Sequence, residues 1–310
     1  MQPLILPFQT NFYQGKVRDV YTINNRWVIL HSSNRISAFD VILPHPIPYK
    51  GQVLNQIAAY MLNACKDICP VWLTETPGPD ISVGHLCKPI KIEMVVRAHL
   101  TGHAWRTYHS GKRNLCGVNL PEKMIENEPF QQPIITPSTK ADEGHDEDIS
   151  ADEIRSRGLA SEQIWEELSN YSLQLFKRGA TIAREKGLIL VDTKYEFGLY
   201  NNQVMLMDEI HTPDSSRYFY VDGFEERLRK GEKPVQLSKE FVREWLIENN
   251  FMGKAGQQVP EMNHDWIELI SKRYIELFEK VTGNTFIPIK RTAEETRQEL
   301  IEVAERLGKI

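Results

Sequence analysis

The segment from Leu188 to Glu209, LILVDTKYEFGLYNNQVMLMDE, constrains the fold of this chain more than any other feature. It contains two apolar runs, each leading into charged residues, and a short polar segment separates them. Two apolar runs around a short polar turn are typical of a β-hairpin. Because side chains alternate between the two faces of a strand, Asp192, Lys194 and Glu196 are predicted to share one face.

The register of this hairpin, around the turn at Asn201-Asn202, decides which carboxylates meet. A two-residue loop pairs Glu196 with Met207 and places Asp208 on the opposite face. A loop of three or five residues instead pairs Glu196 with Asp208 on one face. Two carboxylates and a lysine at strand ends are suited to Mg²⁺ held against an anionic substrate. The alternating pattern alone equally allows an edge hairpin with a solvated charged face.

The length and composition of the chain narrow its class. With 310 residues it can bury a large core, and we expect two lobes, formed by residues 1–112 and 113–310. A formal net charge of −5 argues against a general nucleic-acid binder. No apolar run approaches the roughly 20 residues of a membrane helix, and no secretion signal is recognised, so we expect a cytoplasmic protein. Four cysteines are too few for a disulfide framework and are expected to be buried thiols.

Periodicity predicts a β-rich N-terminal part and a mixed C-terminal part, which together indicate an α+β protein with a cleft between its lobes. Strands are expected within residues 12–34 and 90–100, and a long loop over 121–149. The expected helices cover residues 53–62, 162–186, 239–249, 265–281 and 293–307. Ser150 with Glu153 and Thr292 with Glu295 form the pattern of capping boxes at helix starts.

Two further segments carry side chains suited to anions. Gly15 allows backbone N–H groups to approach a phosphate, with Lys16 and Arg18 beside it, although a glycine turn with two exposed basic residues is common. Arg97 lies inside an otherwise apolar strand and needs a partner. A phosphate or carboxylate ligand and a buried structural ion pair are equally compatible with that position.

Six motifs occur in one order along the chain: GKVRDVY, SSNRISAFDVILPHPIPYKG, IEMVVRAHLTG, TPSTKADEGHDEDIS, VDTKYEFG and MDEIHTPDSSRYF. In this set and order the sequence closely resembles the SAICAR synthetase family. The resemblance implies a two-lobed α+β fold, similar to ATP-grasp enzymes and protein kinases, with ATP in the cleft between the lobes. It further implies ligation of L-aspartate to 5-amino-1-(5-phospho-D-ribosyl)imidazole-4-carboxylate, which yields SAICAR, ADP and phosphate, through an acyl phosphate, in purine biosynthesis.

The resemblance also assigns roles to individual residues. The residues that match the family's ATP side are Gly15, Lys16, Arg18, Lys140 and, by proximity to the adenine, Glu93. The carboxylates that match its Mg²⁺ ligands are Glu196 and Asp208, which favours a hairpin loop of odd length. The residues that match the ribonucleotide and aspartate sites are Asp40, Arg97, His103, Asp146, Asp192, Lys194 and Arg217. Among them, Lys194 and Asp192 are expected beside the reacting carboxylate.

The sequence departs from the family pattern at two positions. His103 stands where a serine near the ribonucleotide phosphate is usual, and an imidazole still donates a hydrogen bond. Asn34 stands where aspartate is frequent, and it keeps a hydrogen-bonding oxygen while losing a charge. Neither change involves the metal carboxylates or the phosphate loop, so activity is expected to survive.

Three other functions remain compatible with the sequence. A small-molecule kinase of similar shape would hydrolyse or transfer phosphate without L-aspartate. A non-catalytic nucleotide-binding module would be expected to lack an acidic metal ligand. A fusion with a carboxylase would need more than 310 residues. The expected partners are the two small-molecule substrates, with no nucleic acid or membrane, in a monomer or a homo-oligomer.

Overall fold

The protein is an α+β structure, as predicted. The computed structural model describes residues 4–140 and 146–310. The chain forms two compact units. Unit 1 comprises Met1–Tyr60, Trp72–Leu86 and Ser238–Ile310, and unit 2 comprises Met61–Val71 and Cys87–Leu237. Both units therefore draw on chain segments from either side of residue 112, the boundary that the sequence predicted.

Unit 1 is built on a five-stranded antiparallel sheet in the order β1-β2-β3-β7-β6. Its strands are β1 (Gln9–Gln14), β2 (Arg18–Ile23), β3 (Trp27–Ser32), β7 (Ile81–His85) and β6 (Leu73–Gly78). A small hairpin pairs β4 (Ser37–Ala38) with β5 (Val41–Ile42). The helices are α1 (Lys50–Ala64), which extends into unit 2, α6 (Glu240–Glu248), α7 (His264–Thr282) and α8 (Ala293–Gly308).

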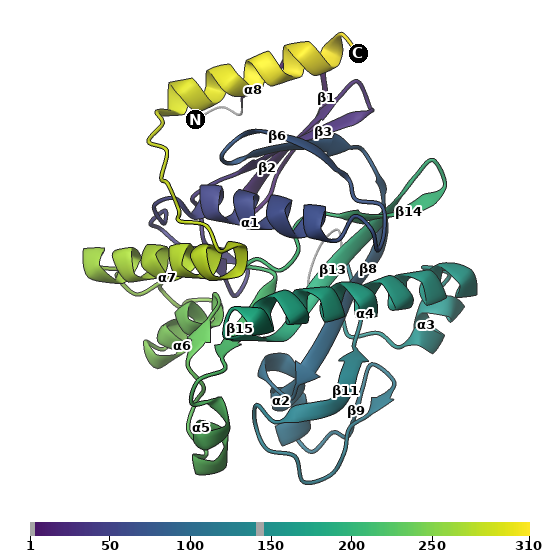
Figure 1. Ribbon diagram of the computed structural model, residues 1–310, viewed down its shortest axis with the longest axis vertical. Helices are drawn as coiled ribbons and strands as arrows, with labels where there is room; N and C mark the ends of the chain where they lie inside the picture. The colour runs from purple at the N-terminus through teal and green to yellow at the C-terminus, as the bar shows by residue number, and fades with distance from the viewer. Residues whose placement is uncertain (1–3, 141–145) are drawn as a thin grey trace. The chain divides into compact units, whose positions relative to one another are not determined.

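The C-terminal helix α8 covers one face of this sheet (Figure 1). Tyr21, Ile23 and Ile29 alternate along β2 and β3, so they point to the same face. They are buried against Leu300 and Leu307, which lie two turns apart on α8. The first and last segments of the chain therefore share one hydrophobic core.

Unit 2 contains a seven-stranded antiparallel sheet. Its main path runs β11 (Pro129–Ile135), β8 (Lys88–His99), β13 (Leu188–Tyr200), β15 (Ser216–Tyr220) and β16 (Gln236–Leu237). Beside this path, β12 (Ser138–Thr139) pairs with β8, and β14 (Gln203–Met207) pairs with β13. A separate ladder joins β9 (Asn114–Leu115) to β10 (Val118–Asn119). Strand β13, the first strand of the predicted hairpin, is thus a central strand.

Helix α4 (Glu162–Glu185) packs along β8 and β13 in unit 2 (Figure 1). Tyr171 of α4 stacks on Phe197 of β13, with 6.4 Å between the ring centroids. The remaining helices of this unit are α2 (Gly102–His109), α3 (Ala151–Ser156) and α5 (Phe224–Lys230). The apolar face of β13 is therefore covered by α4, and its charged face is the opposite one.

Most predicted elements are confirmed, including the capping boxes of α3 and α8. The prediction of a long loop over 121–149 is wrong in part. Residues 129–135 form β11 and residues 138–139 form β12, and both pair with β8. Strand β11 contains prolines and β12 has only two residues, so both are recognisable only once their partner strand is known.

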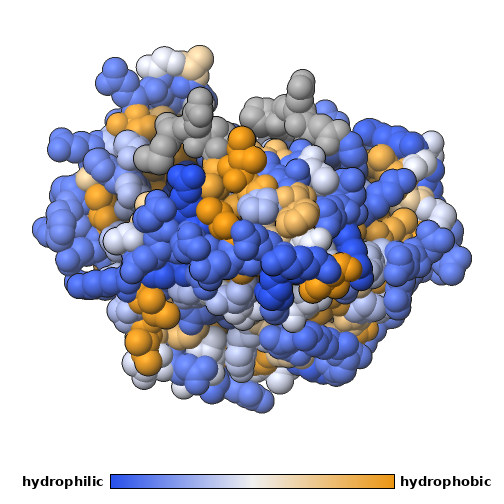
Figure 2. Space-filling view, turned by 90° about the horizontal axis from the view of Figure 1, so that it is seen from above, coloured by the Kyte–Doolittle hydropathy of each residue, from blue (hydrophilic) through white to orange (hydrophobic). Residues whose placement is uncertain are grey.

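The face of the molecule in Figure 2 is mostly hydrophilic, with small hydrophobic patches between the polar residues.

Cys65, Cys69 and Cys87 are buried free thiols, as expected, and Cys116 is half-buried. Burial raises the pKa of Cys65 to about 11, which keeps this thiol protonated. Within residues 4–140 and 146–310, no helix is long and apolar enough to cross a membrane.

Candidate functional site

The hairpin of β13 and β14 has a two-residue loop, so the prediction of an odd-length loop is wrong. Tyr200 pairs with Gln203 and Glu196 pairs with Met207. Asn201 and Asn202 both adopt left-handed backbone angles, with φ of 51° and 62°. Two successive left-handed residues form the tight turn that matches the twist of a hairpin, and asparagine tolerates this conformation.

Asp208 nevertheless interacts electrostatically with Glu196, because the backbone departs from strand geometry at Asp208. Its φ of 56° is left-handed, so the face alternation of β14 does not extend to its side chain. Burial raises the pKa of the Glu196 carboxyl, and the negative charge of Asp208 raises it further. The structure thus brings the two predicted metal carboxylates together by a route that strand register does not predict.

Two lysines neutralise the carboxylates around Glu196. Glu93 of β8 lies directly opposite Glu196 and accepts a 2.6 Å hydrogen bond from Lys194 Nζ. Lys140 forms an ion pair with Glu196. Burial alone would lower the pKa of Lys194, but the adjacent carboxylates outweigh it and raise the pKa above its ordinary value. The Glu196 side chain is only 11% exposed, so the alternative of a solvated charged face does not hold.

A row of three charges crosses the neighbouring strands β8, β13 and β15. Asp192 lies opposite Arg97 on one side and opposite Arg217 on the other. Its Oδ2 accepts hydrogen bonds from both guanidinium groups, and the distance to Arg97 Nη1 is 3.1 Å. The pairing of β13 with β15 shifts register between Leu190 and Asp192, which is a bulge beside the row. The partner that Arg97 required is therefore Asp192, whose one negative charge lies between the positive charges of Arg97 and Arg217.

Gly102 makes room for one of these arginines. Its φ of +56° favours glycine, and a Cβ there would lie 2.5 Å from Arg217 Nη2. Thr136, which sequence analysis did not single out, accepts a 2.8 Å hydrogen bond from Arg97 Nε. Its signal was its place in the TPSTKA motif.

His103 pairs with Asp148, two residues beyond the predicted Asp146. Its Nε2 lies 2.7 Å from Asp148 Oδ2, and both side chains are partly exposed. The hydrogen bond to His103 lowers the pKa of the Asp148 carboxyl. Asp146 is exposed, and its role remains a prediction. Residues 141–145 of the TPSTKADEGHDEDIS motif lie outside the described residues.

The predicted phosphate loop lies in unit 1, between β1 and β2. Gly15 donates its N–H to the carbonyl of Arg18 at 2.8 Å, which closes the turn. Lys16 forms an exposed ion pair with Asp40, whose left-handed φ of 62° belongs to the β4–β5 turn. An exposed pair of this kind contributes little stability.

Arg35, which was not among the predicted site residues, contacts this loop. Its Nη2 donates to the carbonyl of Gly15 at 3.1 Å, and its Nε donates to the carbonyl of Lys16 at 3.2 Å. The same guanidinium binds Asp19 of β2, with Nη2 2.8 Å from Oδ1. The arginine of the SSNRISAFD string was the only available signal, and in isolation that string reads as a loop.

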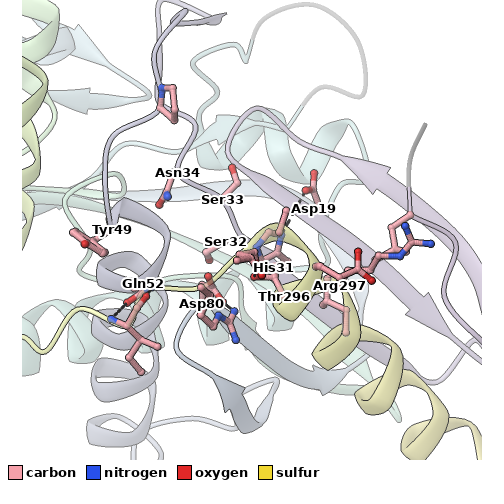
Figure 3. Close-up of a pocket in the computed structure, with 18 of the residues that line it drawn as sticks. Asp19, His31, Ser32, Ser33, Asn34, Tyr49, Gln52, Asp80, Thr296 and Arg297 are labelled. Atoms are coloured by element: carbon pink, nitrogen blue, oxygen red, sulfur yellow. Dashed lines mark hydrogen bonds and ion pairs between the residues drawn. The ribbon is translucent and has the colours of Figure 1, made fainter. Parts of the chain in front are cut away.

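A cavity of about 1060 Å³ also lies in unit 1, bordered by β1, β2, β3, α1 and the first two turns of α8 (Figure 3). Residues that line it include Asp19, His31, Asn34, Gln52 and Thr296. Gly15, Lys16, Arg18 and Asp40 are not among the lining residues. The cavity therefore adjoins two of the motifs, through Asp19 and residues 32–34, without being lined by the residues assigned to the phosphate loop or by Asp40.

The oxygen ligands near Glu196 fit a hard cation only if a substrate completes the coordination. Among the described residues no group of three or more His, Cys, Asp or Glu side chains is placed to hold a metal ion. Glu196 and Asp208 supply two carboxylates, and Mg²⁺ typically uses one or two carboxylates together with phosphates and water. The residues therefore fit a metal that arrives with a nucleotide.

Comparison with known proteins identifies the relatives of this chain. A model of the SAICAR synthetase family matches residues 11–260. The phosphoribosylaminoimidazole-succinocarboxamide synthase of Bacteroides thetaiotaomicron is 58% identical over 304 residues, which cover 98% of this chain and 94% of that protein. The synthase of Cytophaga hutchinsonii is 58% identical over 281 residues, 91% of this chain and 90% of that protein. SAICAR synthase from Saccharomyces cerevisiae, solved with SAICAR, has a TM-score of 0.77 at 30% identity, covering 91% of this chain and 96% of that one.

Proposed function

The chain belongs to the SAICAR synthetase family, and on that premise we propose which of its residues carry out the family's reaction. The protein is a ligase that forms a carbon–nitrogen bond. It uses ATP to join L-aspartate to 5-amino-1-(5-phospho-D-ribosyl)imidazole-4-carboxylate in purine biosynthesis. The assignment of roles to individual residues is our proposal.

One observation carries the proposal: a single sheet face in unit 2 holds two adjacent clusters of opposite net charge. Arg97, Asp192 and Arg217 carry one more positive than negative charge. The second cluster, which comprises Glu93, Lys140, Lys194, Glu196 and Asp208, carries one more negative than positive charge. The first cluster suits an anion and the second a cation.

The spacing of the clusters fits the ribonucleotide. Asp192 and Glu196 are four residues apart on β13, roughly 13 Å at the usual rise of a strand. With the substrate phosphate bound by Arg97 and Arg217, the imidazole carboxylate is placed at Lys194, the member of the second cluster that lies two residues from Asp192 on β13. The high pKa of Lys194 keeps its ammonium charged, so it can neutralise the carboxylate.

We propose that the reaction proceeds through an acyl phosphate. A carboxylate oxygen of the ribonucleotide attacks the γ-phosphorus of ATP, and ADP leaves. The amine of L-aspartate then attacks the acyl carbon, and phosphate leaves with the carboxylate oxygen. No protein nucleophile is needed, so these residues act by neutralising charge, aligning the substrates and excluding water.

Glu196 and Asp208 are the residues that would hold Mg²⁺ on the ATP phosphates. When bound, the ion would neutralise charge on the transferring phosphoryl group. In the absence of the ion, Lys140 supplies the positive charge beside Glu196. We propose that Lys140 exchanges this ion pair for a phosphate oxygen when the nucleotide binds.

We place the reaction in the cytoplasm, because ATP and the ribonucleotide are multiply charged. Moving charged groups through an apolar layer is costly, so these substrates do not cross membranes unaided.

The Gly15–Arg18 loop is proposed to bind ATP phosphates through its backbone N–H groups and its two basic side chains.

The first test measures ADP release with each substrate omitted in turn. Release that requires ATP, the ribonucleotide and L-aspartate together supports the ligase, whereas release independent of L-aspartate indicates a kinase. A ribonucleotide labelled with ¹⁸O in its carboxylate should pass one label to the released phosphate. Unlabelled phosphate would refute the acyl phosphate.

The second test removes a metal carboxylate. Glu196→Ala is expected to lower turnover by at least about a hundredfold, the scale of losing one preorganised electrostatic group. Glu226→Ala is the matched control, because it also removes a carboxylate paired with a lysine, at 2.6 Å, but on the surface of α5. Near-normal turnover of Glu196→Ala at saturating Mg²⁺ would disprove the role of this residue.

A further inference from the structure

Arg35 and Ser33 donate hydrogen bonds to carbonyl groups of the Gly15–Arg18 loop. Arg35 donates to the carbonyls of Gly15 and Lys16, at 3.1 and 3.2 Å. The hydroxyl and the N–H of Ser33 both donate to the carbonyl of Val17, at 2.8 and 3.0 Å. Three consecutive loop carbonyls are therefore bound to one short segment of the chain.

These contacts fix the direction of the loop's N–H groups. In a planar trans peptide the N–H points away from the C=O of the preceding residue. The carbonyls of Gly15, Lys16 and Val17 point toward the Ser33–Arg35 segment. The N–H groups of the three residues that follow them, from Lys16 to Arg18, consequently point to the other side. Successive N–H groups that point to one side form an anion-binding concavity.

The segment that holds the loop is itself anchored. The side-chain Oδ1 of Asn34 accepts a 3.0 Å hydrogen bond from the N–H of Gly51, in the first turn of α1. The main-chain carbonyl of Asn34 accepts a 2.8 Å hydrogen bond from the N–H of Ile47. A Cβ at Gly51 would overlap the carbonyl oxygen of Ser32, so glycine allows α1 to approach this segment. Asn34, one of the departures from the family pattern, thus retains a structural role through its amide oxygen.

Asp19 holds the guanidinium of Arg35 in place. Its two carboxylate oxygens accept from Nη2 at 2.8 Å and from Nη1 at 3.3 Å, a bidentate arrangement. Burial raises the pKa of Asp19, but hydrogen bonds from His31 and Arg35 outweigh burial and keep the pKa below its ordinary value. Asp19, His31, Ser33 and Asn34 border the cavity of unit 1 (Figure 3).

We propose that Arg35 is a positioning residue for ATP, which holds the Gly15–Arg18 loop with its N–H groups turned toward the phosphates. This inference rests on the proposed role of that loop in ATP binding. A lysine at position 35 can reach only one of the acceptors at a time, and glutamine cannot bridge the loop to Asp19. Arg35 is therefore not expected to contact the reacting atoms.

The test compares Arg35→Gln and Arg35→Lys with the wild type by calorimetric titration of a non-hydrolysable ATP analogue and by steady-state kinetics. Each lost hydrogen bond to a charged donor corresponds to about tenfold, so Arg35→Gln should raise the Kd and the KM for ATP at least about tenfold. Arg35→Lys should give an intermediate value. The KM for the ribonucleotide should stay within about twofold.

The matched control is Arg306→Gln, which removes an ion pair with Glu75, at 2.6 Å, in the same unit but on α8. It should leave ATP affinity unchanged. If Arg35→Gln and Arg35→Lys bind the analogue as the wild type does, or if every KM rises together, Arg35 is a structural residue only and the inference is wrong. A wild type that fails to bind any ATP analogue would overturn the proposed function and this inference with it.

Discussion

Two buried histidines are expected to make the folded protein sensitive to mild acid. His211 is fully buried and His99 is 6% exposed. Burial lowers the pKa of each imidazole to about 4. Between that value and the ordinary pKa of about 6.5, the unfolded chain binds a proton at each site and the folded chain does not. Stability therefore falls as the pH falls through this window, and the loss stops below about pH 4.

The size of the effect follows from these two pKa values. At 1.36 kcal/mol per pKa unit, each histidine costs about 2 kcal/mol between pH 7 and pH 5, or about 4 kcal/mol for both. That loss is a large fraction of the roughly 5–15 kcal/mol that stabilises a typical protein. Glu196, whose pKa is raised, has the opposite effect, so the histidines must be isolated by mutation.

Urea unfolding at pH 7, 6 and 5, followed by circular dichroism, measures the slope of the unfolding free energy against pH. His99→Gln and His211→Gln should each reduce that slope, even where the substitution lowers stability at pH 7. His264→Gln is the control, because the side chain of His264 is 82% exposed. A double variant, lacking His99 and His211, with the wild-type slope would refute the reasoning.

Three substitutions test the ribonucleotide site. Gly102→Ala should raise the KM for the ribonucleotide by about tenfold, through strain at a left-handed residue and a clash with Arg217. Gly111→Ala, at a left-handed glycine in open space, separates strain from clash and should leave the KM unchanged. Arg217→Lys should raise the KM for the ribonucleotide much more than that for ATP, and equal effects would move this residue to the nucleotide site. His103→Ser removes the hydrogen bond that lowers the pKa of Asp148 but should retain turnover, and a loss above about tenfold would implicate His103 in the reaction.

Local sequence patterns predicted the charged face of β13, because alternation depends only on the strand itself. Asp192, Lys194 and Glu196 do share a face, and Arg97 does have an ionic partner. The buried setting of these charges was not predictable from the hairpin alone. It arises because β8 and β15, distant in sequence, pair with β13 on either side.

The failures in prediction have backbone causes. The odd-length loop was inferred because strand alternation would otherwise separate Glu196 from Asp208. Left-handed angles at Asn201 and Asn202 give the shorter loop, and a left-handed angle at Asp208 ends the alternation. Arg35 was missed because its acceptors are main-chain carbonyls, which no side-chain pattern reveals.

The shared core of β2, β3 and α8 sets an order of events during synthesis. The residues of unit 2, up to Leu237, leave the ribosome before α8 is made. The sheet of unit 2 can therefore form on the nascent chain. Tyr21 and Ile29 emerge early, yet their covering residues Leu300 and Leu307 are made only after all of unit 2. Until α8 is made, the apolar face of β2 and β3 therefore stays exposed to solvent. A chain released before Leu300 would keep that face exposed, which makes truncated products targets for chaperones and proteases.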